Sequence, residues 1–182
     1  MSFRNTSTTY GSVAKFFHWL IFILVFFMII LGYFLDDIPK EYKGSVINVH
    51  KWIGLTILTL MILRAAWALT NPKPVLPGIT APWEKSVERS VHLLLYLVII
   101  AMPLSGWIGS TAAGKAPHLG SLTFALPWIE TSKPLAHSAF DTHSLLAITI
   151  IVLVSLHVFA ALYHYFIKKD DVLRRMMPNQ SK

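Results

Sequence analysis

The stretch HSLLAITIIVLVSLHVFAALYHYFI, residues 143–167, decides the fold, because it is apolar over the length that crosses a membrane and still carries histidine. His143 and His157 are 14 residues apart. That spacing is about 3.9 helical turns, or about 21 Å along the axis, so both rings point nearly the same way. A histidine at bilayer depth is costly and indicates a functional site. We therefore expect two stacked metal centres, one near each membrane face.

The composition places the whole chain in the membrane class. Of its 182 residues, 54% are hydrophobic and 14% are charged, and the mean hydropathy is +0.57. A soluble domain of this size could not bury so much apolar surface. Because lipid forces backbone groups to pair internally, we expect an all-α membrane protein, a four-transmembrane-helix bundle forming one domain over 1–182. Its predicted spans are about 16–35, 46–69, 91–111 and 143–167, the first being an uncleaved span.

The charged residues predict the orientation. If the spans alternate, eleven lysines and arginines lie on the side of the N-terminus and five on the other side. The positive-inside rule then places both termini in the cytoplasm of a bacterial inner membrane. Topology also explains the net charge of +7, so we expect no nucleic-acid partner. The absence of cysteine excludes disulfides, cysteine-held iron–sulfur clusters and covalent haem attachment.

The connecting segments carry three predictions. The inner connection over 70–89 contains four prolines, so it should be extended, and the third helix should begin near 81–85. The outer loop over 112–142 is the longest, and its apolar patch 122–128 is predicted to be strand-like or an interfacial lid. The last helix is expected to continue beyond the membrane as an amphipathic stretch over 165–177.

Four histidines pair by their depth in the predicted spans. His50 and His143 begin spans at the outer side, whereas His18 begins a span at the inner side and His157 lies deeper, towards that side. Two neutral imidazoles fill both axial positions of an iron, which predicts two haem b groups held without covalent bonds. One such histidine is equally well explained by a hydrogen bond between helices. Four histidines at two matching depths favour metal ligation.

Three other side chains belong to the inner level. His92 enters its span at about the depth of His18, so the sequence also allows it as the partner of His157, or beside a haem propionate or a quinone. Arg64 follows His50 by 14 residues and is placed to pair with propionates of the inner haem, unless it only snorkels to the interface. His164 is either a proton-exchanging group beside a quinone headgroup or an interfacial histidine among tyrosines.

These motifs together resemble the bacterial cytochrome b561 family, over nearly the whole chain. The matching stretches are FFHWL at His18, NVHKWIG at His50, ILRAAW at Arg64, RSVHLLLYL at His92, DTHSLLA at His143 and SLHVFAALYHYFIKKDDVLRRM at the end. In that family the first, second and fourth helices supply the axial histidines. The resemblance therefore implies His18 with His157 at the inner haem, His50 with His143 at the outer haem, and His92 outside the ligand set.

Within this family the chain is similar to the superoxide oxidases. That similarity implies an enzyme that oxidises superoxide at the periplasmic face and reduces ubiquinone near His164 at the cytoplasmic face. Lys51, Lys115 and Lys133 are candidates for steering the anion, although five outer carboxylates oppose a uniformly positive surface. An alternative is a dihaem electron-transfer subunit that links a partner dehydrogenase or periplasmic donor to the quinone pool. The third possibility is a helical bundle without haem.

Overall fold

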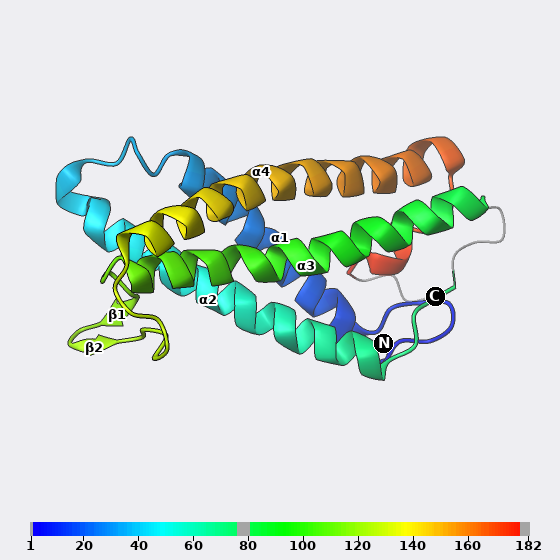
Figure 1. The fold of residues 1–182 in the computed structure, drawn as a ribbon. Coiled ribbons are helices and arrows are strands. Elements are labelled where there is room, and N and C mark those ends of the chain that lie inside the picture. Colours follow the sequence, from blue (N-terminus) through cyan, green and yellow to red (C-terminus); the bar gives the residue numbers. More distant parts are fainter. Residues whose placement is uncertain (1, 76–80, 179–182) are drawn as a thin grey trace.

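Four long helices form a bundle with a small hairpin at one end (Figure 1). The structure is a computed structural model that describes residues 2–75 and 81–178. The helices are α1 (Ser12–Tyr33), α2 (Lys40–Thr70), α3 (Pro82–Ala112) and α4 (Lys133–Tyr163). Each is long and apolar enough to cross a membrane. The predicted all-α membrane bundle is therefore confirmed.

The apolar core lies between the two histidine levels and is built by all four helices. Its buried members are Ile21, Val25, Ile57, Met61, Val98, Ile99, Ile150 and Leu153. Large apolar side chains such as Phe16, Leu97 and Phe159 are instead exposed on the outside of the bundle. Because lipid is as apolar as leucine, close packing rather than transfer from water holds such helices together. The core thus spaces the two levels rigidly.

All four helices begin earlier than the apolar spans predicted from the sequence. Predicted starts at 16, 46, 91 and 143 become starts at Ser12, Lys40, Pro82 and Lys133. Hydropathy detects only the part of a helix that lies in lipid, whereas capping decides where the helix begins. The Glu84 carboxylate accepts a hydrogen bond from the backbone N–H of Ala81 at 2.9 Å, and the Ser132 hydroxyl caps α4. The prediction that the third helix begins near 81–85 is confirmed.

The outer loop between α3 and α4 contains a two-stranded hairpin. Strands β1 (His118–Leu119) and β2 (Leu122–Thr123) pair antiparallel across a turn with Gly120 at φ 59°. The hairpin is fixed to α2 because Asn48 donates to the His118 carbonyl at 2.8 Å and accepts from its N–H at 3.1 Å. The predicted apolar patch 122–128 is therefore strand-like only at its beginning.

The segment after α4 turns back under the bundle instead of extending away from it. A π-helical turn over His164–Lys168 is followed by Lys169 in the left-handed conformation at φ 54°, and a short 3₁₀ helix covers Arg174–Met176. The helix continues only to Lys168, so the predicted amphipathic helix over 165–177 is wrong beyond that residue. The reversal is held by Trp19, whose indole N–H donates to the Met176 carbonyl at 2.8 Å. The first and last helices are thus joined at the end of the bundle opposite the hairpin (Figure 1).

Candidate functional site

The outer histidine pair joins α2 to α4. The ring centroids of His50 and His143 are 6.3 Å apart, with planes inclined by 63°. Nδ1 of His143 lies 2.9 Å from the Met102 carbonyl oxygen and 3.2 Å from the Ser105 hydroxyl. Because a carbonyl oxygen only accepts, Nδ1 carries the proton, which leaves Nε2 as the nitrogen able to bind a metal.

Helix α3 approaches the outer pair very closely. A Cβ atom on Gly106 would lie 3.0 Å from both Cε1 and Nδ1 of His143, so glycine is needed for the ring to sit there. Nδ1 of His50 is buried without a hydrogen-bond partner among the described residues. An unsatisfied buried group costs about 1–3 kcal/mol. Hydrogen bonding to the described residues therefore does not explain the place of His50.

The inner histidine pair joins α1 to α4. The ring centroids of His18 and His157 are 6.1 Å apart, with planes inclined by 58°. Nη2 of Arg64 lies 3.2 Å from Nδ1 of His18, and the guanidinium also stands 5.4 Å from the ring centroid of Tyr96. The structure therefore brings Arg64 to the inner level, as its spacing from His50 indicated, rather than into the interface alone.

His92 also reaches the inner level but makes a different contact. Its ring centroid is 5.2 Å from that of His157, nearly perpendicular at 79°. Nδ1 of His92 lies 2.8 Å from both the carbonyl and the carboxylate oxygen of Glu88, one turn earlier on α3. The side chain is thus tied to its own helix and flanks the pair formed by His18 and His157.

The spacing of both pairs fits a haem iron. Two imidazoles on opposite sides of one iron, each bound at about 2 Å, have ring centroids about 6 Å apart. The pairs at 6.1 and 6.3 Å meet this condition, whereas His92 and His157 at 5.2 Å are too close. Within residues 2–75 and 81–178, no group of three or more histidines and carboxylates is arranged to hold a bare metal ion. The donor sets therefore suit two axial sites better than a metal cage.

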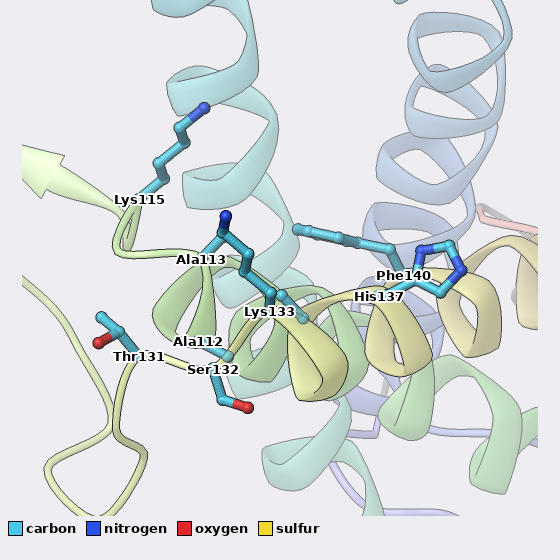
Figure 2. A pocket seen from close by; sticks show the side chains of 9 residues that line it. Ala112, Ala113, Lys115, Thr131, Ser132, Lys133, His137 and Phe140 are labelled. Carbon is cyan, nitrogen blue, oxygen red and sulfur yellow. The ribbon is translucent and has the colours of Figure 1, made fainter.

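The outer end carries lysines around an open hollow. Lys115 and Lys133, with His137 and Phe140, line a cavity of about 590 Å³ beside the start of α4 (Figure 2). The ammonium group of Lys51 donates a hydrogen bond to the Lys115 carbonyl, which holds the two lysines together. The three lysines predicted from the sequence therefore gather on one side of the outer end.

Carboxylates on the same end offset part of this positive charge. Oδ2 of Asp141 lies 3.4 Å from Nε2 of His137. Asp36 forms a 2.8 Å ion pair with Lys43, and the hydrogen bond from that ammonium lowers the pKa of the Asp36 carboxyl. The positive region is consequently local to the hollow and does not cover the whole outer end.

The inner end carries paired charges. Nδ1 of His164 lies 2.6 Å from Oδ2 of Asp170, and the Lys168 ammonium is paired with the Glu84 carboxylate of α3. The sequence pattern alone does not single out Asp170. Its contact depends on the chain reversal at Lys169, which no spacing rule predicts, so the only available signal was the short separation from His164.

The chain is similar to known proteins along its whole length. A model of the family described as prokaryotic cytochrome b561 matches residues 9–179. Cytochrome b561 homolog 2 of Escherichia coli is 33% identical over all of this chain and 97% of its own length. A probable superoxide oxidase, CybB, of Yersinia pestis is 28% identical over 90% of this chain and 92% of its own. Cytochrome b562 of Cereibacter sphaeroides is 28% identical, with 88% and 89% covered.

Proposed function

Because this chain belongs to the prokaryotic cytochrome b561 family, we propose that it is a superoxide:ubiquinone oxidoreductase of the bacterial inner membrane. Membership alone makes it a multi-pass membrane cytochrome that carries b-type haem and transfers electrons. The observation that carries the proposal is the two histidine pairs, with centroids 6.1 and 6.3 Å apart, at opposite ends of one bundle. Bound haem b would supply one-electron transfer at each.

The proposed ligands are His18 with His157 at the inner site and His50 with His143 at the outer site. Fourteen residues of α4 separate the two levels, which is about 21 Å along the helix axis. The hydrogen bond between His143 and the Met102 carbonyl orients that ring for ligation. Arg64 supplies a positive charge beside His18, suited to the propionates of an inner haem.

The proposed reaction takes two superoxide ions, one ubiquinone and two protons to two dioxygen molecules and one ubiquinol. Superoxide is oxidised at the outer end, where Lys51, Lys115 and Lys133 supply the positive charge that attracts an anion. Ubiquinone is reduced at the inner end, where His164 supplies a proton. The similarity to a probable superoxide oxidase supports the choice of donor.

The proposal is tested by giving the oxidised, detergent-purified protein enzymatically generated superoxide while the haem absorbance is recorded. We expect a reduced b-type spectrum to appear quickly, superoxide dismutase to abolish it, and added ubiquinone to reverse it. A spectrum that responds to dithionite but not to superoxide would reject superoxide as the donor.

An electron-transfer subunit is the second candidate, and the outer hairpin favours it. Leu119, Leu122 and Trp128 of this loop are 67%, 65% and 74% exposed. Exposed apolar groups gathered at one end of a molecule are typical of a surface that binds a partner. This candidate predicts that a dehydrogenase or periplasmic redox protein co-purifies with the chain and reduces its haem, whereas superoxide does not.

A further inference from the structure

A histidine–aspartate pair closes the inner end of the bundle, just beyond α4. Nδ1 of His164 and Oδ2 of Asp170 are 2.6 Å apart, and their side chains are only 15% and 4% exposed. We propose that Asp170 is a positioning residue, which fixes the His164 ring so that its Nε2 delivers a proton to the ubiquinone headgroup. This inference rests on the proposed function, since it assigns a task to a residue of the same quinone site.

The backbone is shaped to hold this carboxylate in place. Lys169 in the left-handed conformation reverses the chain, and the backbone N–H of Asp170 then donates to the His164 carbonyl at 3.2 Å. Oδ1 of Asp170 accepts from the N–H of Val172 at 3.0 Å while Oδ2 faces the imidazole. Both oxygens are therefore engaged, so the carboxylate cannot rotate away without breaking a bond.

The chemistry of the pair fixes which nitrogen of His164 is available. An ionised carboxylate only accepts, so the proton of the short bond belongs to Nδ1. Nε2 has no hydrogen-bond partner within residues 2–75 and 81–178 and is left for a ligand.

The other charged groups near His164 are already paired. Glu84 of α3 is paired with Lys168 of the π-helical turn. Tyr163 presents its ring edge-on to the imidazole at a centroid distance of 6.1 Å. Asp170 is thus the carboxylate that is hydrogen-bonded directly to the His164 ring.

The proton transfer balances with the proposed reaction. Ubiquinone gains two electrons, which come from two superoxide ions, and two protons. One proton moves from Nε2 of the His164 imidazolium to an oxygen of the reduced headgroup: the N–H bond breaks, the O–H bond forms, and a neutral imidazole remains bonded to Asp170. Water at the inner face supplies the second proton and then recharges His164.

The test uses the quinone half of the reaction alone, so that it does not depend on the donor. Holoprotein is reduced with dithionite, freed of excess reductant and mixed with ubiquinone-1 in a stopped-flow instrument. Asp170→Asn keeps the size of the side chain and removes its charge. We expect its maximal rate of haem oxidation to fall about tenfold, with the quinone concentration for half-maximal rate within about twofold and the haem content unchanged.

Asp171→Asn is the matched control, because it makes the same change one residue away. Its carboxylate is 67% exposed and lies 3.7 Å from Arg174, so we expect a rate within about twofold of the unmodified protein. A merely structural role of Asp170 is tested by a double-mutant cycle. In a His164→Gln background, Asp170→Asn should cause no further loss of rate, because the positioned ring is absent.

A measurement on the unmodified protein gives an answer even if the Asp170 variants fail to fold. In ¹⁵N spectra of histidine-labelled protein, assigned by the signal that His164→Gln removes, we expect His164 to carry a proton on Nδ1. The inference is overturned if that proton resides only on Nε2, if Asp170→Asn matches Asp171→Asn, or if its effect is undiminished beside His164→Gln. Failure of ubiquinone-1 to oxidise the unmodified protein would instead reject the proposed function.

Discussion

The two ends of the bundle carry histidine pairs of nearly the same spacing but in different surroundings. At the outer end, the imidazole of His143 is held by a neutral carbonyl, and lysines stand beside an open hollow. At the inner end, the imidazole of His18 touches the charged Arg64, and beyond it lie the shielded pairs of His164 with Asp170 and Lys168 with Glu84. Under the proposed function, one ligand arrangement would serve two tasks: oxidation of an anion at the outer end and proton-linked quinone reduction at the inner end.

Removing one ligand from each end gives the largest effect and tests whether the ends are independent. We expect His143→Ala to lose the outer haem and His157→Ala the inner haem, so that each falls from about two haems per chain to about one. Haem quantified by the pyridine haemochrome method against protein mass checks this. If either variant lost both haems while staying folded, the ends would form one cooperative unit.

A smaller change at the outer end tests how closely α3 must approach. Gly106→Ala places a Cβ 3.0 Å from the His143 ring, whereas Gly54→Ala places one at an ordinary 3.8 Å from Pro103. Both changes raise helix propensity by a similar amount. Only Gly106→Ala also adds a steric cost of about 1–3 kcal/mol, so this cost distinguishes the two variants. We expect Gly106→Ala alone to lower outer haem occupancy. Equal occupancy in the two variants would show that the His143 ring moves without cost.

Arg64 distinguishes the ends by charge. Arg64→Gln removes a positive charge beside His18, so we expect the midpoint potential of the inner haem to fall by on the order of 60 mV, about tenfold for a one-electron couple. Redox titration should show the outer potential unchanged. Arg89→Gln, on an exposed part of α3, makes the same charge change and serves as the control. A fall in the midpoint potentials of both haems would mean that Arg64 affects them by stabilising the bundle and not by its charge beside His18.

The lysines of the outer end should give the smallest effect. Lys51→Gln combined with Lys115→Gln is expected to slow reduction by superoxide several-fold at low salt, and the difference should shrink as ionic strength screens the charges. Stopped-flow haem reduction over a salt series measures this. Lys40 lines a different hollow at the outer end, so Lys40→Gln is the control. A salt-independent rate would remove these lysines from the mechanism.

Periodicity and depth in the sequence sufficed to predict the four helices and to assign the histidines to two levels, with His50 and His143 at one level and His157 with His18 or His92 at the other. Both predictions depend on the rise per residue of a helix and on the thickness of the membrane. These two lengths are the same for every span. The choice between His18 and His92 was open, because depth does not determine distance across the bundle. The structure places both beside His157 at different spacings, so the role of each stays a prediction.

The features that the sequence did not reveal depend on single backbone conformations. Helix α4 begins at Lys133, ten residues before the predicted span at 143, because Ser132 caps it there. The tail was predicted as an amphipathic helix over 165–177 because it contains both charged and apolar residues. One left-handed residue, Lys169, reverses the chain instead and creates the contact between His164 and Asp170.

The returning tail also sets an order of assembly. The segment that binds the Trp19 indole and the Lys15 ammonium through the carbonyls of Met176 and Met177 follows all four spans in synthesis. The hairpin that seals the opposite end against Asn48 is made before α4. During biogenesis the contact between the hairpin and α2 can therefore form before the contact that closes the opposite end of the bundle.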